Sequence, residues 1–212
     1  MEILRDNILR ELKKRMPGVD KFDGMRDAAV LIPFICGKGE VPEIEILFEV
    51  RAESLKRQPG EICFPGGSFE EKDGSFERTV VRETCEELGL TEKDVEVWGE
   101  LDTFVANMGS VVHPFVGRLK NREAIRPVTA EVSEVFTVPL GFFLDTPPEV
   151  REMELWDKAG DDFPFDFIPR GSAWRARKKY RIWFWRWENH VVWGMTARML
   201  RSFLERFRGV LK

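Results

Sequence analysis

Three glutamates, Glu83, Glu86 and Glu87, stand at positions i, i+3 and i+4 of one short segment. If the segment is helical, their carboxylates lie on one face, where like charges repel unless a cation neutralises them. The opposite face would carry an apolar row made of Val81, Thr84, Cys85 and Leu88. Magnesium binds carboxylate oxygens and usually keeps water and substrate phosphates as its other ligands. The spacing therefore predicts a helix that is buried on one side and holds a divalent metal on the other.

The flanking residues predict where this helix begins and ends. Ser75 or Asp73 can cap its N-terminus, and Gly89 stands where a left-handed C-terminal cap is expected. Before the helix, Gly66 and Gly67 allow the backbone to approach a metal or a phosphate closely. The unit is thus predicted to be a glycine-containing loop, a helix over about 75–88 and a second loop.

This unit resembles the Nudix box, Gly-x5-Glu-x7-Arg-Glu-U-x-Glu-Glu-x-Gly-U, in which U is aliphatic. Gly67 and the run 82–90 supply the match. The stretch from Gly67 to Arg82 is one residue longer than the common spacing, so Asp73 takes the early acidic position. Thr84 replaces an aliphatic residue. The resemblance rests on the intact Arg-Glu-x-x-Glu-Glu-x-Gly core.

The segment before the box, residues 47–67, is similar to the signature of coenzyme A pyrophosphatases within that superfamily. That signature opens with Leu-Leu-Thr and closes with Phe-Pro-Gly-Gly. Here the opening triplet is Leu47-Phe48-Glu49, and Lys56 replaces an arginine. Lysine keeps the charge but loses bidentate geometry. The subfamily also tolerates the longer loop after Gly67, and the similarity covers residues 25–206.

The resemblance implies an α/β fold, the Nudix-type α/β/α sandwich with a mixed sheet. It implies a Nudix hydrolase domain over residues 25–212, preceded by an N-terminal helix and linker over 1–24 that pack on the domain. Periodicity alone gives only α+β or mixed α/β. It predicts strands over 27–36, 43–50, 94–105, 111–119, 132–138 and 180–188, and helices over 2–16 and 194–208 besides the box helix.

The stretch 147–171 is rich in Pro, Asp and Phe, and it is predicted to be a loop. We expect the wider segment 147–180 to form a lid or a dimer contact that shapes the substrate pocket. Phe163, Phe165 and Phe167 would then supply an apolar wall. An alternative is that these three rings simply cover the core. A homodimer is left open.

The resemblance also implies roles for the acidic residues. Glu83, Glu86 and Glu87, with Gly67, would hold Mg²⁺ or Mn²⁺, and a glutamate of this group or Glu131 would act as the general base. Glu134 is a weaker candidate for that later position. Their other interpretation is a solvated acidic surface. Three further residues are expected to support the site: Arg82, through a pair with Glu86 at i+4, Gly66 and Gly89.

The expected reaction is hydrolysis of a diphosphate linkage, with coenzyme A or acyl-CoA yielding 3′,5′-ADP and 4′-phosphopantetheine. Arg51, Lys56 and Arg57 are candidates to meet the nucleotide phosphates, although a solvated basic loop explains them nearly as well. One alternative is a Nudix hydrolase of NADH, ADP-ribose or a nucleoside triphosphate. Another is a non-catalytic Nudix-fold binding module, which the intact glutamates disfavour.

Composition limits the remaining classes. The 212 residues suit one domain, and the net charge of −4 gives no overall sign of nucleic-acid binding. No apolar run reaches the length of about 20 residues that spans a bilayer. The three cysteines are widely spaced and fit a reducing compartment without a zinc site, so we expect a cytoplasmic protein.

The histidines and the basic, aromatic run 174–187 are also candidates for function. His113 and His190 are expected to be structural or surface residues. The aromatic run could bind single-stranded nucleic acid by stacking. Its alternation instead favours a strand covered on both faces, which would contribute to the core, a dimer contact or a lid, with nucleotide stacking as a further alternative.

Overall fold

The structure is a computed structural model that describes residues 24–37, 43–106, 109–167 and 174–211, together with Val19 and Lys21. The expected N-terminal helix over 2–16 lies outside the described residues. Among the described helices, none is long and apolar enough to cross a membrane.

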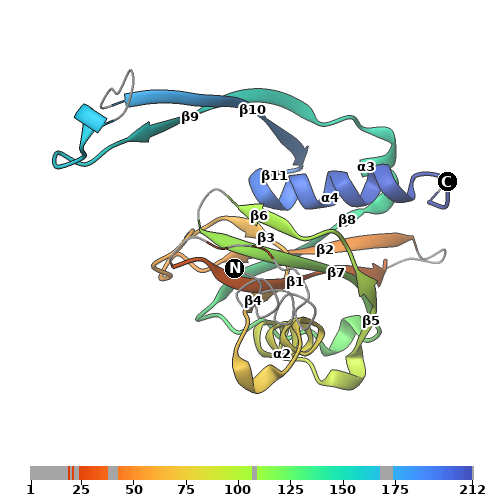
Figure 1. Ribbon diagram of the computed structural model, residues 1–212. Helices are drawn as coiled ribbons and strands as arrows, with labels where there is room; N and C mark the ends of the chain where they lie inside the picture. The colour runs from red at the N-terminus through yellow and green to blue at the C-terminus, as the bar shows by residue number, and fades with distance from the viewer. Residues whose placement is uncertain are drawn as a thin grey trace, which may run out of the picture.

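A mixed sheet forms the centre of the molecule (Figure 1). Its strands are β1 (Arg26–Cys36), β2 (Ile44–Arg51), β3 (Ile62–Cys63), β4 (Gly66–Ser68), β5 (Val95–Glu100), β6 (Phe104–Ala106), β7 (Ser110–Leu119) and β8 (Val132–Pro139). The main order is β3-β2-β1-β7-β5, with β4 beside β1, β6 beside β7 and β8 beside β2. Strands β1 and β7 run parallel and the other pairs are antiparallel, so the expected mixed sheet is confirmed.

Helices cover both faces of this sheet, as Figure 1 shows. Helix α2 (Phe76–Leu88) lies on one face, and α4 (Gly194–Phe207) lies on the other, with the short α3 (Leu140–Asp145). Alternation along β1 explains the two layers: Leu31 packs with the core under α2, while Ile32 packs with the core under α4. The α/β/α arrangement is therefore as expected, although the sequence analysis did not include α3.

The stretch predicted to be a loop over 147–171 contains a strand, so that prediction is wrong. Strand β9 (Glu149–Lys158) pairs with β10 (Trp174–Trp187), and β11 (His190–Trp193) completes a second, antiparallel sheet. Apolar and charged residues mix on each side of β9, so its sequence lacks the period of two that marks a half-buried strand. Its partner β10 supplies the pairing that the local pattern does not reveal.

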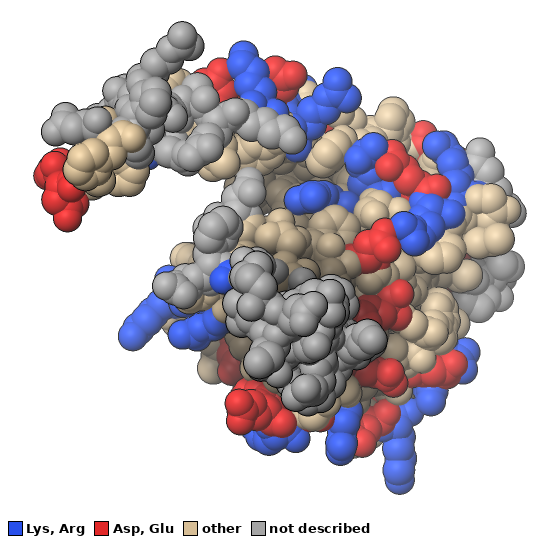
Figure 2. Space-filling view, in the orientation of Figure 1, with Lys and Arg blue, Asp and Glu red and all other residues tan. Residues whose placement is uncertain are grey.

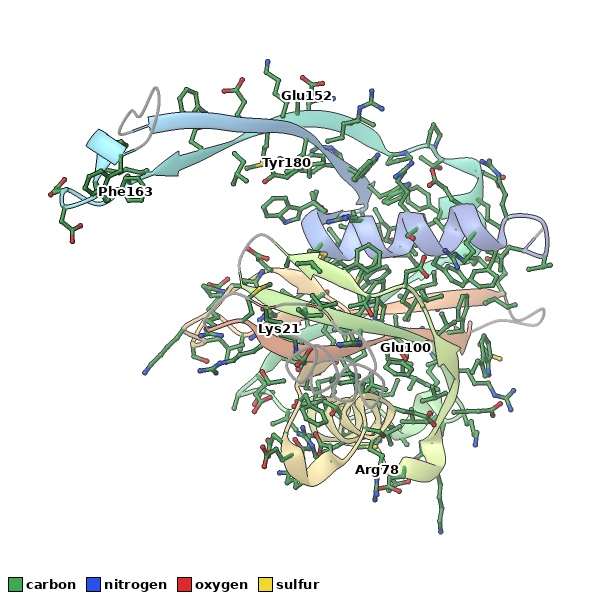
Figure 3. All side chains as sticks on the ribbon, in the orientation of Figure 1. Lys21, Arg78, Glu100, Glu152, Phe163 and Tyr180 are labelled. Atoms are coloured by element: carbon green, nitrogen blue, oxygen red, sulfur yellow. The ribbon has the colours of Figure 1, made fainter. Side chains whose placement is uncertain are left out.

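The β9–β10 hairpin extends from the body as an arm, with Phe163 near its tip (Figures 1 and 3). Figure 3 shows Glu152 on the side away from the body and Tyr180 on the side toward it. Met153, the register partner of Tyr180, is 46% exposed. Tyr180 and Met153 therefore place an apolar, only partly covered patch on the side of the arm that faces the body.

The single strand predicted over 94–105 is divided into β5 and β6. Both pair with β7, but residues 101–103 leave the ladder between them. The register also shifts between Val97 and Gly99, and Leu101 donates its N–H to the carbonyl of Pro114 at 2.8 Å. A bulge and a break of this kind change the direction of the chain between β5 and β6, while both strands keep β7 as their partner.

Candidate active site

Helix α2 has the limits that its flanking residues predict. Ser75 Oγ accepts a hydrogen bond from the Arg78 N–H at 3.2 Å, and Gly89 is left-handed with φ 64°. A Cβ at Gly89 would stand 2.4 Å from the carbonyl oxygen of Arg126. Conformation and space therefore both require glycine there.

The carboxylates of α2 are not equally exposed, which corrects the simple picture of one buried and one solvated face. Glu87 is only 4% exposed and shares the buried side with Val80, Thr84 and Leu88. Glu86 is exposed, and Glu83 lies between these extremes. The buried residues of α2 begin with Thr79 and Val80, and Glu87 lies two turns beyond them on the same side of the helix. The exposure of the three carboxylates thus decreases from Glu86 through Glu83 to Glu87.

Gly66 and Gly67 bring the loop backbone against these carboxylates. The Gly66 N–H donates to Glu87 Oε2 at 2.8 Å. Gly66 has φ 145°, and a Cβ on it would stand 2.2 Å from the carbonyl oxygen of Ala29. A Cβ on Gly67 would come within 2.6 Å of the Glu83 carboxylate. Gly66 is therefore required by its conformation and by the backbone of β1, and Gly67 leaves room for the Glu83 carboxylate in its present position.

Arg82 connects the acidic residues around the helix. Its guanidinium donates to Asp73 from Nε at 2.8 Å and from Nη2 at 2.9 Å. Nη1 donates to Glu83 at 2.9 Å and makes the expected i+4 pair with Glu86 at 3.1 Å. Arg82, with hydrogen bonds from Thr79 and the Glu70 N–H, holds the pKa of Asp73 well below its usual range. Asp73 fills the early acidic position of the motif as a partner of Arg82.

Glu131 belongs to the same electrostatic neighbourhood, whereas Glu134 does not. Burial raises the pKa of Glu83 and of Glu87, and the negative charge of Glu131 raises both further. Glu134 instead pairs with His190 Nε2 at 3.1 Å. The structure therefore brings to the α2 carboxylates the glutamate that the sequence analysis preferred.

The candidate phosphate-binding residues separate into two groups. Arg51 is half-buried and its charge acts on Glu87, opposing the rise in the pKa of that carboxyl. Lys56 and Arg57 are exposed in the loop that follows, and neither makes an ion pair with a described residue. Arg51 is thus a residue of the acidic site itself, and the other two are free to meet a ligand.

Sequence reasoning missed Glu49. This residue of β2 is 1% exposed, and neither carboxylate oxygen has a hydrogen-bond partner among the described residues. Burial raises the pKa of Glu49 well above its usual range, and the neighbouring carboxyl of Glu87 raises it further. The signal was visible as a departure from a pattern, since Glu49 stands where the subfamily signature has threonine.

The carboxylates do not converge on one point in this structure. Among the described residues, no group of three or more His, Cys, Asp or Glu side chains has the geometry to hold a metal ion. Arg82 lies between Glu83 and Glu86, and Gly66 holds Glu87. The donor chemistry nevertheless fits a hard divalent cation, because oxygen ligands predominate and the buried carboxylate of Glu49 lacks a partner.

Both histidines fit the structural reading. His113 lies between Asp27 and Glu100 at 3.2 and 3.1 Å and stacks on Phe76 at 3.6 Å between ring centroids. His190 stacks on Phe136 at 3.7 Å between ring centroids.

In the aromatic run 174–187, Ile182 and Trp185 are buried, and the Trp185 indole donates to the carbonyl of Thr146. Lys and Arg are mixed with Asp and Glu over the face in Figure 2, so no basic stripe crosses that face.

A hollow of about 660 Å³ lies on the other side of β2 and β8. Its lining comes from the loop before the box, from β8 and from the β10–β11 hairpin, and includes Glu61, Glu134, Phe184, His190 and Trp193. The hollow therefore adjoins both Pro59–Ile62 and the base of the arm.

Comparisons with known proteins agree with this geometry. The NUDIX domain model matches residues 25–158. The chain is 35% identical over 167 residues to the peroxisomal coenzyme A diphosphatase NUDT7 of Mus musculus, covering 76% of this chain and 69% of that one. It is 39% identical over 127 residues to the peroxisomal coenzyme A diphosphatase ndx-8 of Caenorhabditis elegans, covering 59% and 53%.

A bacterial relative matches over a longer stretch. The uncharacterized Nudix hydrolase NudL of Photorhabdus laumondii is 30% identical over 183 residues, which cover 86% of each chain. The matched domain includes β1 to β9 and all of the α2 site. The chain accordingly belongs to the Nudix family and is a pyrophosphohydrolase of that family.

Proposed function

We propose that the chain hydrolyses the diphosphate linkage of coenzyme A or acyl-CoA, giving 3′,5′-ADP and 4′-phosphopantetheine or its acyl form, with Mg²⁺ or Mn²⁺. The observation that carries the proposal is the combination of the α2 carboxylates at the Gly66–Gly67 loop with the coenzyme A diphosphatase relatives. Nudix hydrolases generally use divalent metal ions. Bound between the carboxylates, the ion would neutralise charge on the diphosphate and lower the pKa of a water.

The chain's own residues would divide the remaining work. Glu83, Glu86 and Glu87 would hold the cation with the Gly67 backbone, and Arg82 would orient Glu83 and Glu86. Glu131, which is exposed beside the cluster, or a glutamate of the trio would take the proton from the attacking water. Arg51 would face the diphosphate from the strand side.

Lys56 and Arg57 would meet the phosphates of the nucleotide end. Both are exposed and free of ion pairs with described residues, so binding a phosphate breaks no existing contact. The arm, which carries the patch of Tyr180 and Met153 on its side toward the body, would serve as a lid or as a contact within a homodimer. Three free cysteines support a reducing, cytoplasmic location.

A substrate panel tests this proposal. CoA, acetyl-CoA, NADH, ADP-ribose and dGTP are compared by kcat/KM with Mg²⁺ or Mn²⁺, and products are identified by mass. We expect a CoA compound to be cleaved best and to release 3′,5′-ADP. If NADH, ADP-ribose or dGTP is cleaved tenfold better, the substrate assignment is wrong and the other Nudix activity takes its place. The absence of turnover on every compound would favour a binding module.

Lys56 offers a sharper test of how the substrate lies. CoA carries a 3′-phosphate that dephospho-CoA lacks, so Lys56→Ala should raise KM for CoA more than for dephospho-CoA. Lys56→Arg should preserve the preference. Lys93→Ala, an exposed lysine on the turn Glu92–Asp94, is the matched control and should change neither KM. Equal effects of Lys56→Ala on both substrates would remove Lys56 from the 3′-phosphate.

A further inference from the structure

Glu49 is a buried acid at a position where its strand could have placed an apolar residue. Alternation along β2 puts Glu45, Leu47 and Glu49 on the same side of the sheet, toward α2. Leu47 is part of the core beneath α2, and Glu49, two residues farther along, is equally buried. A carboxylate in such a place is costly unless something compensates it.

The protein supplies little compensation. The charged groups that act on Glu49 are Glu87 from α2, Glu131 from the segment before β8, and Arg51 from the same strand. Cys63, its register partner on β3, adds a thiol whose pKa burial raises, with Glu49 as the largest charge that raises it further. Three carboxylates thus face one guanidinium, and neither oxygen of Glu49 accepts a hydrogen bond from a described residue.

The contrast with Glu45 shows that this strand can pair an acid when pairing is its role. Glu45 lies four residues earlier on the same side of β2, and its Oε2 accepts from Arg122 Nη1 at 2.7 Å. Arg122 also donates to Thr137 Oγ1 from β8, so the pair is fixed within the fold. Glu49 has no equivalent cationic partner, and the carboxyl of Glu87 is the largest charge that acts on it.

Glu87 is itself held in place by the backbone. One of its carboxylate oxygens, Oε2, accepts the N–H of Gly66, which holds the side chain against the loop. Two buried carboxylates side by side, one of them anchored, suit a doubly charged cation that prefers oxygen ligands. A threonine, which the subfamily signature has at this position, brings no charge to such a site.

We propose that Glu49 is a further carboxylate of the cation site and acts with Glu87, so that the site is built from strand β2 as well as from helix α2. This inference rests on the proposed metal-dependent function. It predicts that the cation binds more tightly here than it would with threonine at position 49.

Direct metal binding tests the inference without relying on activity. Mn²⁺ binding is measured by electron paramagnetic resonance and by calorimetry on the full chain, for the wild type, Glu49→Gln, Glu49→Thr and the control Glu45→Gln. We expect both substitutions at position 49 to weaken Mn²⁺ binding on the order of tenfold or more. Glu45→Gln should bind Mn²⁺ as the wild type does.

Thermal unfolding in EDTA and in excess Mn²⁺ separates this role from a purely structural one. Glu49→Gln should raise the midpoint temperature in EDTA, because it removes an acid from a buried acidic cluster, and should reduce the increase that Mn²⁺ produces. Glu45→Gln should lower the midpoint in EDTA and leave the Mn²⁺ increase intact. Unchanged Mn²⁺ affinity in both position-49 variants would overturn the inference, whatever their stability.

The wild type distinguishes this inference from the proposed function. If the wild type binds Mn²⁺ and cleaves CoA, and the position-49 variants bind Mn²⁺ equally well, only the role of Glu49 is wrong. If the wild type binds no Mn²⁺, the metal-dependent function and the inference both fail. Should Glu49→Gln fold poorly, Glu49→Thr carries the comparison, since threonine is the residue of the subfamily signature.

Discussion

Asp73 and Glu49 are both buried acids beside α2, at 6% and 1% exposure, yet their surroundings are opposite. Asp73 accepts hydrogen bonds from the Arg82 guanidinium, from Thr79 Oγ1 and from the Glu70 N–H. Glu49 accepts none from a described residue and faces Glu87. The pKa of Asp73 is lowered by Arg82, and the pKa of Glu49 is raised by burial and by Glu87.

The difference separates acids that hold the fold from acids that are poised for a ligand. A buried carboxylate with a guanidinium partner is stable at neutral pH, and removing the acid leaves a buried cation. A buried carboxylate beside another carboxylate favours a shared proton or a metal ion. The site therefore includes both kinds, one from the turn Glu71–Asp73 before α2 and one from strand β2.

The largest expected effect comes from the acids that face another acid and are available to bind a cation. Glu87→Gln should lower kcat for the best substrate by at least about 100-fold, because it removes a negative ligand from the cation site. The fold should persist, since glutamine can still accept the Gly66 N–H. Steady-state kinetics and circular dichroism measure the two quantities on one preparation.

Glu86→Gln extends this test to the exposed end of the trio and should also reduce turnover strongly. In EDTA neither variant should be less stable than the wild type, because each loses a like charge. Full activity in both variants would show that the trio is not the catalytic metal site. The distinction between structural acids and ligand-binding acids would then have no functional support.

The next largest effect concerns Asp73, the acid that stabilises the fold. Asp73→Asn should destabilise the protein by about 2 kcal/mol, since Arg82 loses its bidentate partner but keeps Glu83 and Glu86 close to the surface. For a chain of 212 residues, this corresponds to a fall in Tm of roughly 4–8 °C. Calorimetry in EDTA measures it.

The matched control is Glu70→Gln. Glu70 is half-exposed and its carboxylate comes only within 3.9 Å of Arg82, so the Tm should change little. If Asp73→Asn left the Tm unchanged as well, Asp73 would have no structural role of the kind described.

Stability as a function of pH should show the two acids with opposite signs. The pKa of Asp73 is lowered, so its contribution is present above about pH 3.9 and is lost as the pH falls below that value. Burial, together with the neighbouring carboxyl of Glu87, raises the pKa of Glu49 well above its usual range, so the metal-free protein should lose stability as the pH rises above about 4.3. Urea unfolding in EDTA across pH 3–8 measures both slopes.

The variants assign each slope to its acid. Asp73→Asn should reduce the loss of unfolding free energy at acidic pH and leave the loss toward neutral pH unchanged. Glu49→Gln should reduce the loss toward neutral pH and leave the loss at acidic pH unchanged. Excess Mn²⁺ should remove the loss of stability toward neutral pH in the wild type. Identical pH profiles for the two variants would contradict the distinction between the acids.

The smallest expected effect comes from substitutions in the arm, which should not change the surroundings of Asp73 or Glu49. Replacing Phe163, Phe165 and Phe167 by serine should raise KM for CoA a few-fold and change kcat less, since the metal chemistry lies elsewhere. Phe163 and Phe167 are 43% and 86% exposed, so the rings do not cover the core and Tm should hold. An unchanged KM would exclude these rings from the substrate pocket.

Some features of this protein follow from local sequence alone. Ser75, Gly89 and the period of 3.6 in residues 76–88 determine a capped helix, because capping and left-handed glycine are properties of neighbouring residues. The continuous apolar run Ala28–Ile35 and the alternation in 44–50 likewise determine β1 and β2. The resemblance to the family was likewise carried by local sequence, through Gly67 and the intact Arg-Glu-x-x-Glu-Glu-x-Gly core of residues 82–89.

Other features were decided by tertiary structure. Strand β9 has no readable period and exists through its pairing with β10, a contact between segments that a chain pattern does not contain. The burial of Glu87 depends on where β4 crosses α2. The effect of the Glu87 charge on Glu49 depends on strand β2 lying beneath the same helix. Partners of a buried charge come from other elements, so sequence alone named the acids of α2 and Asp73, whereas the fold revealed Glu49 and decided which acids were paired with Arg82 and which faced another acid.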